Sequence, residues 1–536
     1  MNLISQHLPI LQIVVPMVAA PLCIILRRRQ LVWILAVVVA WTCLAMAGGL
    51  MLQVLSQGPI SYHLGGWAPP WGIEYRVDAV NAFVLILVSL IGAVVLLYAP
   101  ASIAAELPEA RASLFYTAYL LCLTGLMGMT ITGDAFNVFV FLEISSLSMY
   151  ALIGMGTDRR ALTASFQYLI VGTIGATFFV IGIGLLYMMT GTLNMADLAE
   201  RLQPVMHKRT VLAAFAFLTV GLSLKLALFP LHLWLPNAYT YAPSVVTAFV
   251  AATATKVSVY VFLRFFYGIF GREYAFDTLH LEYFLVPLGL AGVFVASTVA
   301  VFQTNLKRLL AYSSIAQVGY MVVGIGLVSV TGLTATLVHL FNHAVMKGAL
   351  FLALGCIVMR LGTVELSELR GIGKRMPVTM AAFVFGGLSL IGVPLTVGFI
   401  SKWYLVSAAL ERGWWPVAVL ILLGSLLAVA YIWKVVETAY FHEPEGKAAQ
   451  ATEAPLSMLI PTWILIGATL YFGATATFTA GLARAGAEAL MGGLARWRHT
   501  RPSWFRCCCR SPSVRSSPCA DHARIFAIHS RSLQVC

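Results

Sequence analysis

Ionisable side chains lie inside apolar segments at several points of this 536-residue chain. The segment 221–241 contains Lys225 near its middle, followed by Pro230 and His232. A lysine at bilayer depth costs on the order of 3 kcal/mol, and a proline inside a helix frees a backbone carbonyl that needs another partner. Lys225 and His232 are seven residues apart and would share one face of a helix that continues past the break. We therefore expect this face to line a hydrated interior, where the lysine holds or passes charge.

Glu143 is a second ionisable residue in mid-segment, within the apolar run 134–153. An unpaired carboxylate is expensive at this depth, so Glu143 either finds a partner or stays neutral. One interpretation is a purely structural ion pair. The other is a pair with Lys225 that controls proton movement. A nearby carboxylate would hold the lysine protonated, and its withdrawal would let the lysine release its proton.

Lys256 and three residues of a later segment extend this pattern. Lys256 lies well inside its apolar segment, where it either carries charge or reaches an interface with its long side chain. His339, His343 and Lys347 follow one another at one-turn spacing and share a helix face. Two histidines beside a lysine make a poor metal site, whereas a histidine titrates near neutral pH and suits a proton relay. A hydrogen-bonded core histidine remains the alternative for all three histidines, His232 included.

Lys402 follows a second predicted helix break, at Pro394 in the long segment 377–409. If the helices pack around one axis, the candidates form a row of titratable groups at mid-depth, which stepwise proton transfer requires. That row comprises Glu143, Lys225, His232, Lys256, His339, His343, Lys347 and Lys402. Interface positions are the preferred interpretation for Asp78 and Lys307–Arg308, and for Lys434 an interface position and a functional role are equally open.

Composition places these residues in a membrane protein, because 60% of the chain is hydrophobic and only 10% is charged, against about 25% charged in soluble domains. Windows of about 20 apolar residues predict an all-α polytopic protein with about fourteen transmembrane helices. The predicted spans are 8–26, 31–54, 77–98, 112–131, 134–153, 162–189, 212–236, 243–268, 282–302, 308–329, 334–359, 377–409, 415–440 and 456–483.

The two predicted broken helices, the seventh and the twelfth, are five segments apart. An odd offset of this kind is what an inverted-topology repeat produces. We therefore expect three N-terminal helices, two inverted five-helix repeats (spans 4–8 and 9–13) and one last helix. The corresponding ranges are 1–111, 112–268, 282–440 and 456–490.

Charges in the loops predict the orientation of these spans. Lys and Arg are more numerous in the set of loops that includes Arg27–Arg29 and Arg159–Arg160, which we expect to be cytoplasmic, with both termini on the other side. The first apolar run is followed by arginines, not by a cleavage site, and is expected to be retained.

The net charge is +13, but the chain has no soluble basic domain of the kind that binds nucleic acid. No Cys/His spacing suggests zinc, haem or an iron–sulfur cluster, so no cofactor is expected.

The last part of the chain differs from the rest. Residues 491–536 hold eight arginines and five of the nine cysteines. This segment is neither membrane-like nor amphipathic, and its arginines would lie on the outer side, against the loop-charge rule. We expect a disordered or non-native basic, Cys-rich tail.

Four motifs in this order resemble the antiporter-like subunits shared by respiratory complex I and the Mrp-type multi-subunit Na⁺/H⁺ antiporters, and among these the Mrp D subunit most. They are Lys225–Tyr239, Leu306–Tyr320, Asn342–Phe351 and Gly392–Trp403. The resemblance implies fourteen helices with the seventh and twelfth discontinuous, and work inside a hetero-oligomer of homologous and small membrane subunits. It also implies that Glu143 and Lys225 control a proton path which Lys256 and His343 continue and Lys402 ends.

The expected function is proton translocation in a multi-subunit antiporter of the cell (inner) membrane that exchanges Na⁺ or K⁺ for protons. For the chain itself, a secondary transporter subunit is favoured over an enzyme. The alternative is a proton-pumping subunit of complex I or of a membrane-bound hydrogenase, in which case the chain is part of a translocase. A membrane enzyme acting on lipid or isoprenoid would call for a polar cluster in a long loop, and the loops are short. A scaffold subunit with vestigial charges would tolerate loss of Lys225.

Overall fold

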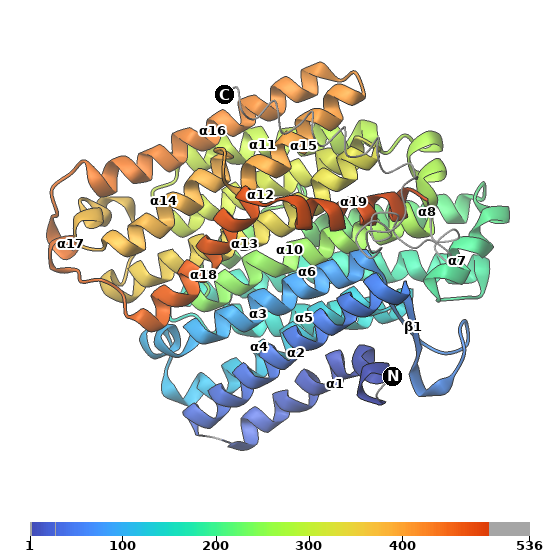
Figure 1. Cartoon of the computed structure of the whole chain (residues 1–536), viewed down its shortest axis with the longest axis horizontal. Helices are drawn as coiled ribbons and strands as arrows, with labels where there is room; N and C mark the ends of the chain where they lie inside the picture. Colours follow the sequence, from blue (N-terminus) through green and yellow to red (C-terminus); the bar gives the residue numbers. More distant parts are fainter. Residues whose placement is uncertain (1–2, 27, 493–536) are drawn as a thin grey trace, which may run out of the picture.

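Long apolar helices make up most of the computed structural model, which describes residues 3–26 and 28–492 (Figure 1). Within these residues, thirteen helices are long and apolar enough to cross a membrane. They are α1 (Leu3–Leu26), α2 (Arg29–Gln57), α3 (Ala79–Glu106), α4 (Ala112–Ile131), α5 (Ala135–Gly154), α6 (Arg159–Thr190), α8 (Arg209–Leu226), α10 (Ser244–Leu263), α11 (Glu282–Phe302), α12 (Leu306–Gly326), α13 (Val330–Leu361), α16 (Trp415–Tyr440) and α18 (Leu456–Ala474).

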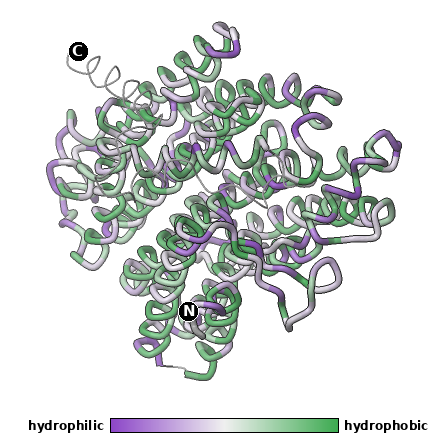
Figure 2. Tube along the Cα trace, turned by 45° about the vertical axis from the view of Figure 1, so that its right-hand side comes forward, coloured by the Kyte–Doolittle hydropathy of each residue, from purple (hydrophilic) through white to green (hydrophobic). Residues whose placement is uncertain are grey.

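One further crossing is made by two shorter helices. α14 (Pro377–Ile391) and α15 (Val397–Glu411) follow one another across a short interruption, so that each alone is too short to span a bilayer. With this pair the described residues make fourteen crossings. Hydrophobic residues run along the helices and hydrophilic residues gather mainly at the turns (Figure 2). The prediction of an all-α polytopic membrane protein is confirmed.

The seventh crossing is also broken. α8 ends at Leu226, and the short helix α9 (Trp234–Tyr241) begins after a seven-residue connection. Ala227 ends α8 in a left-handed conformation, with φ of 58°. The sequence predicted both breaks from their prolines, Pro230 and Pro394, and both prolines lie in the connections between the half-helices.

Short polar side chains set the starts of several crossings. Asp78 accepts hydrogen bonds from the backbone of Val80 and Asn81 at the start of α3, and Asp134 accepts one from Asn137 at the start of α5. Such N-caps satisfy amide groups that have no partner within the helix. The helix boundaries are therefore fixed by local chemistry, as well as by hydropathy.

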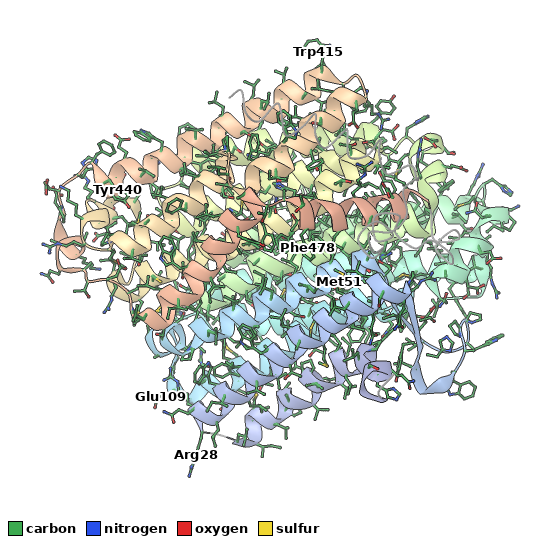
Figure 3. The ribbon with its side chains drawn as sticks, in the orientation of Figure 1. Arg28, Met51, Glu109, Trp415, Tyr440 and Phe478 are labelled. Carbon is green, nitrogen blue, oxygen red and sulfur yellow. The ribbon has the colours of Figure 1, made fainter. Side chains whose placement is uncertain are left out.

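The bundle has two distinguishable ends. Strands β1 (Ile60–His63) and β2 (Glu74–Val77) pair antiparallel, with Ile60 opposite Val77, and lie with the short helix α7 (Met195–Leu202) at one end, hereafter the hairpin end (Figure 1). The short helix α17 (Gly446–Gln450) lies at the opposite end, the α17 end. Figure 3 places Arg28, Glu109 and Tyr440 toward the α17 end. Windows of 20 residues do not detect elements this short.

The core is formed by helices that other helices surround on all sides. α10, α12 and α13 are buried along nearly their whole length, and α13 contacts α3, α10, α12, α15 and α18. At the hairpin end, α10 widens into a π-helical turn over Arg264–Ile269, and a second such turn follows over Glu273–Thr278. These buried helices carry four of the predicted site residues.

The prediction of a single last helix over residues 456–490 is wrong. α18 ends at Ala474, and a separate helix, α19 (Thr477–Met491), follows; both pack against α13. Gly473 lies so close to the connection between α14 and α15 that a Cβ there would be 2.5 Å from the carbonyl oxygen of Leu395. The sequence does not indicate this break, because it contains no proline and no charged residue. The predicted tail, 491–536, lies outside the described residues from 493 onward.

Candidate functional site

The predicted site residues come from five crossings and lie in the interior of the bundle. We use the name buried row for Glu143 of α5, Lys225 of α8, Lys256 of α10, His339, His343 and Lys347 of α13, and Lys402 of α15. All of them except Glu143 are buried. Four of the seven are thus carried on two buried helices, α10 and α13, and the others stand beside them on α5 and on the two broken crossings.

Glu143 and Lys225 form the ion pair that the sequence predicted. The Lys225 Nζ lies 3.8 Å from the Glu143 Oε1, and it donates a 2.9 Å hydrogen bond to the hydroxyl of Ser146. The two side chains differ in exposure, at 5% for Lys225 and 26% for Glu143. The Glu143 side chain is therefore closer to the edge of the chain than that of Lys225, although its Oε1, which faces Lys225, is itself buried.

The break after α8 is built around Lys225. Trp234 donates from its indole nitrogen to the carbonyl of Leu224, at 3.1 Å, and so adds a second hydrogen bond to a carbonyl of the last turn, which also accepts from the backbone of Ala227. His232 lies in the connection between α8 and α9, where its ring stacks on Phe229. The expectation that His232 continues the helix face of Lys225 is therefore wrong, because α8 ends at Leu226.

Lys256 occupies the centre of the bundle and is fully buried. Its Nζ donates to the carbonyl of Ala251, at 2.5 Å, and to the hydroxyl of Thr255, at 3.2 Å. In the part of the chain that the structure describes, the salt bridges include none to Lys256. Neutral oxygens therefore surround an amine that does not reach an interface.

The three residues of α13 share one face, as their spacing predicted. The rings of His339 and His343 are stacked with centroids 6.0 Å apart. One turn further, Lys347 donates to the carbonyl of Leu310, at 2.8 Å, and to the hydroxyl of Ser313. Within the described residues neither ring nitrogen of His343 has a hydrogen-bond partner, nor does Nε2 of His339. Buried polar groups of this kind are usually satisfied by internal water.

Lys402 lies against the break of the twelfth crossing. Its Nζ donates to the carbonyls of Leu390 and Ile391, at 3.0 and 2.8 Å, which are the last carbonyls of α14. A helix C-terminus carries partial negative charge and stabilises a cation. The preceding residue, Ser401, lies 2.8 Å from Nδ1 of His339, and so joins α15 to α13.

Tyr320 of α12 lies near both Lys402 and His339. The Lys402 Nζ is 5.0 Å from the centre of its ring, and the ring of His339 is 6.0 Å away. The sequence pointed to neither Tyr320 nor the serines Ser146, Ser313 and Ser401. Ser146 and Ser401 lie one turn from or beside a charged residue in the sequence, a signal too common to single them out, and Ser313 has no charged residue within one turn.

The positions for which sequence analysis considered an interface role have partners within the protein. Lys434 donates to the carbonyls of Val301 and Gln303, at the end of α11. Lys307 donates to the carbonyl of Ala242, at 3.1 Å. Both contacts are of the kind that basic residues make with helix C-terminal carbonyls. Asp78, in contrast, is paired inside the protein with Arg264.

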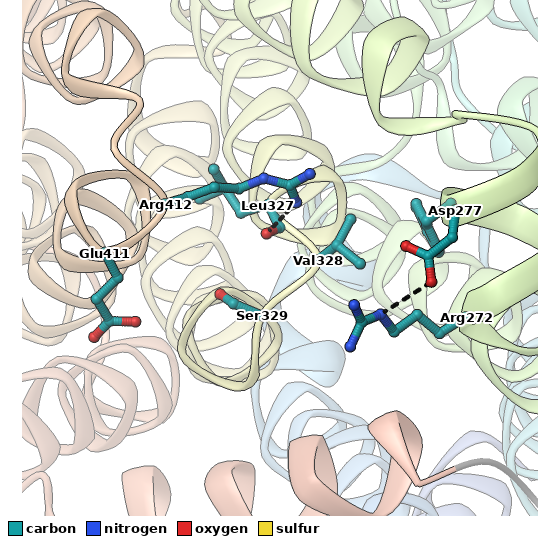
Figure 4. A pocket seen from close by; sticks show the side chains of 8 residues that line it. Arg272, Asp277, Leu327, Val328, Ser329, Glu411 and Arg412 are labelled. Carbon is teal, nitrogen blue, oxygen red and sulfur yellow. Dashed lines mark hydrogen bonds and ion pairs between the residues drawn. The ribbon is translucent and has the colours of Figure 1, made fainter.

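A pocket lies at the ends of α12 and α15 (Figure 4). Arg272 and Arg412 both line it; Arg272 pairs with Asp277, and Arg412 donates to the carbonyl of Leu327, at 2.7 Å. Ten residues of α15 separate Arg412 from Lys402, a rise of about 15 Å. The pocket is therefore at a surface of the bundle, away from the buried row. Within residues 3–26 and 28–492, no three His, Cys, Asp or Glu side chains gather to hold a metal ion.

Comparison with known proteins agrees with this architecture. The family model described as "NADH:quinone oxidoreductase/Mrp antiporter, TM" matches residues 132–428, more than half of the chain. The chain is 42% identical over 476 residues to the N subunit of the NADH-quinone oxidoreductase of Desulforudis audaxviator, covering 86% of this chain and 94% of that protein. It is 30% identical over 469 residues to the D subunit of the Na(+)/H(+) antiporter of Alkalihalophilus pseudofirmus, covering 87% and 94%.

The fold is also similar to that of a solved chain. A chain of the membrane-bound sulfane sulfur reductase, an archaeal respiratory membrane complex, superposes with a TM-score of 0.85 at 30% identity, covering 92% of this chain and 99% of that one. The protein is thus an antiporter-like membrane subunit, and it belongs to the family of transmembrane subunits of NADH:quinone oxidoreductases and Mrp antiporters.

Proposed function

We propose that this chain moves protons along the buried row, as one subunit of a hetero-oligomeric complex that exchanges Na⁺ or K⁺ for protons. The observation that carries the proposal is the succession of buried lysines and histidines across five crossings, with an acid–base pair at its start. Ionisable groups in membrane segments are expensive and generally mark ion or proton pathways. Neutral carbonyl and hydroxyl oxygens, not acids, surround the later lysines.

The pair of Glu143 and Lys225 acts as the switch in this proposal. Together, the carboxylate and Ser146 stabilise the protonated amine. When the carboxylate moves away, the amine loses its countercharge and releases a proton toward Lys256. His343, with Lys347 beside it, and His339 then pass the proton to Lys402, where the α14 carbonyls stabilise the charged form.

The proposal includes the repeat organisation predicted from the sequence. Residues 112–268 and 282–440 are the two inverted five-helix units, which follow the helices of residues 1–111 and precede the segment 456–490. The positions of the two broken crossings support this, because each lies fourth in its unit and each carries a lysine of the buried row near its break. Broken helices at corresponding positions are typical of binding sites in transporters built from repeats.

Neighbouring subunits and orientation belong to the same proposal. The Glu143 side chain lies near the middle of α5 and is 26% exposed, although its Oε1 is buried. A carboxylate facing lipid at this depth would be costly, so we infer that another membrane subunit covers it. We place the complex in a cell (inner) membrane, with the α17 end, where Arg28 lies, in the cytoplasm and both termini on the opposite side.

A second candidate is proton pumping driven by a redox reaction in the same complex. The 42% identity to a subunit of an NADH-quinone oxidoreductase favours it, as does the likeness to a chain of an archaeal respiratory complex. The same buried row could carry protons in a cation/proton antiporter and in a redox-driven pump. Purification of the complex with its partners distinguishes them, since only a redox machine brings subunits that bind electron carriers.

Substitution of the acid–base pair tests the proposal. Lys225→Ala and Glu143→Ala should each abolish cation-dependent proton exchange in membrane vesicles, or redox-driven pumping in the second case, while blue-native gels show an assembled complex. Lys434→Met is the matched control, because both hydrogen bonds that Lys434 donates within the described residues go to the end of α11. Transport at the normal rate in either pair variant would remove that residue from the pathway, and normal rates in both would leave a scaffold role.

A further inference from the structure

Arg264 forms a buried polar network at the hairpin end of α10. Its Nη2 donates to Oδ2 of Asp78, at 2.6 Å, and to the side-chain oxygen of Asn81, and its Nε donates to the hydroxyl of Tyr260, at 2.8 Å. The side chains of Arg264 and Asp78 are 6% and 7% exposed. The guanidinium thus binds residues of two crossings, α3 and α10, at one point.

A third crossing is tied to the same network. Asn81 donates from its amide nitrogen to the carbonyl of Thr130, at the end of α4, and to the hydroxyl of Tyr260, at 2.6 and 2.7 Å. That hydroxyl in turn donates to the Thr130 carbonyl, at 2.9 Å. Short hydrogen bonds around Arg264 therefore connect three helices, α3, α4 and α10.

The network stands between the buried row and the hairpin end. Lys256, Tyr260 and Arg264 follow at four-residue spacing, so they lie along one face of α10, and Arg264 is about 12 Å further along the helix than Lys256. Beside the network lies a small pocket lined by Asp78 and Arg264 together with other residues of the hairpin end, among them the half-buried Arg76 and Ala196.

Stability alone is a weak reason for such a pair. Replacing a buried ion pair by uncharged residues is often neutral or favourable, whereas removing one partner is strongly destabilising. A fixed cation in a narrow passage, on the other hand, is an electrostatic barrier to protons and cations. We propose that Arg264, held by Asp78, Asn81 and Tyr260, is a seal that separates Lys256 from the aqueous phase at the hairpin end.

The seal rests on the proposed function, because it matters only if Lys256 carries protons. In that case a passage open at the hairpin end would let protons run through the buried row without the driving reaction. The network then has a defined task in coupling: it keeps the first half of the row closed on this side of the membrane. Arg264 is a positioning and barrier residue here, and carries no proton itself.

Proton leak through the assembled complex tests the seal. The complex is reconstituted in liposomes holding a pH-sensitive dye, and proton entry after an acid pulse is followed with no cation gradient or redox substrate. Asp78→Asn/Arg264→Gln removes both charges together, and should make proton entry several-fold faster than in the wild type. Adding Lys256→Met should return the leak to the wild-type rate, which a general loss of packing would not do.

An exposed pair of the same kind provides the control. Asp158 caps the start of α6 and pairs with Arg160 at 2.6 Å, at the surface of the protein. The hydrogen bonds from Arg160 hold the pKa of Asp158 below its ordinary value, so this too is a charged pair at neutral pH. Asp158→Asn/Arg160→Gln should leave the liposomes as tight as the wild type. Tyr260→Phe removes a single hydroxyl and should also make proton entry faster than in the wild type. It therefore tests the seal even if the Asp78/Arg264 variant assembles poorly.

The outcomes separate the two proposals. Liposomes that stay proton-tight with both Asp78→Asn/Arg264→Gln and Tyr260→Phe would overturn the seal, and so would a leak that Lys256→Met leaves unchanged. Neither result contradicts the proposed function, which would be contradicted only if transport survived in both Lys225→Ala and Glu143→Ala. A leak that depends on Lys256 would support both.

Discussion

At the scale of single residues, serine hydroxyls form hydrogen bonds with members of the buried row. Ser146 accepts the hydrogen bond of Lys225, and Ser401 binds the ring of His339. A hydrogen bond to a charged group contributes about 1.5–3 kcal/mol, roughly twice the value for neutral groups. A hydroxyl is also both donor and acceptor, so it can follow the change when its partner gains or loses a proton. The serines therefore belong to the proposed pathway as much as the ionisable groups do.

Ser146→Ala should slow transport by about tenfold, because loss of about 1.4 kcal/mol of stabilisation of the Lys225 ammonium corresponds to a factor of ten. Initial rates of proton movement in vesicles measure this. The matched control is Ser145→Ala, since the neighbouring Ser145 hydroxyl is also buried but donates to the carbonyl of Leu142 in its own helix. Equal rates for the two variants would exclude a role for the Ser146 hydroxyl.

Breaks in two crossings position lysines at the scale of elements. A break leaves helix carbonyls without partners inside the membrane, where water is scarce. In the twelfth crossing, Lys402 satisfies two of them, whereas in the seventh Trp234 donates to the Leu224 carbonyl, which also accepts from Ala227, and Lys225 pairs with Glu143. The two breaks therefore place their lysines differently: one is held by backbone carbonyls, and the other by side chains of another helix.

Gly392→Ala should lower both stability and transport. Gly392 ends α14 with φ of 94°, a conformation that other residues rarely adopt, and an added Cβ would lie 3.0 Å from Cδ of Lys402. Left-handed backbone costs about 1–2 kcal/mol outside glycine, and displacement of Lys402 adds to this. Thermal unfolding of the purified complex and vesicle transport measure the two effects.

Gly184→Ala controls for the loss of a glycine inside a membrane helix. Gly184 lies in α6 with φ in the ordinary range and nothing within 4 Å of an added Cβ. Alanine should leave transport unchanged and raise stability by about 0.5–1 kcal/mol, since glycine weakens helix interiors. A Gly392→Ala complex as stable and active as this one would show that the break tolerates a side chain.

At the scale of the whole molecule, the proposed pathway calls for a neighbouring subunit beside α5. Its buried row begins at Glu143, which is the one member at the edge of the chain. The same edge carries large exposed apolar side chains of α5, including Val140 and Leu147. Apolar side chains suit lipid and protein equally, but the carboxylate suits only protein or water. This asymmetry is the basis for placing a neighbouring subunit there.

Leu147→Trp should weaken assembly of the complex. Leu147 is one turn from Glu143 and 56% exposed in the isolated chain, so a larger side chain would collide with a subunit that covers Glu143 but would be accepted by lipid. Leu426→Trp on α16, where the leucine is 64% exposed, is the control. Blue-native gels should show less complex for the first variant only. Intact complex in both would place lipid, and not protein, beside α5.

Local properties of the sequence determined much of this protein. Hydropathy located the crossings, because burial in lipid requires long apolar runs whatever they pack against. Prolines in two of these runs located the broken helices, and charges in apolar surroundings identified the buried row. The pair of Glu143 and Lys225 also followed, since an isolated carboxylate at this depth needs a partner. Each of these inferences depends on a residue and its neighbours in the chain.

Tertiary structure decided which groups surround each charge. It ended α8 at Leu226, so that His232 lies outside the helix, and it divided the last predicted helix beside the α14–α15 break. It also placed Tyr320 against Lys402 and closed Arg264 on Asp78 across 186 positions of the sequence. Such contacts depend on how helices distant in the chain approach one another, and neither hydropathy nor spacing within one segment contains that information.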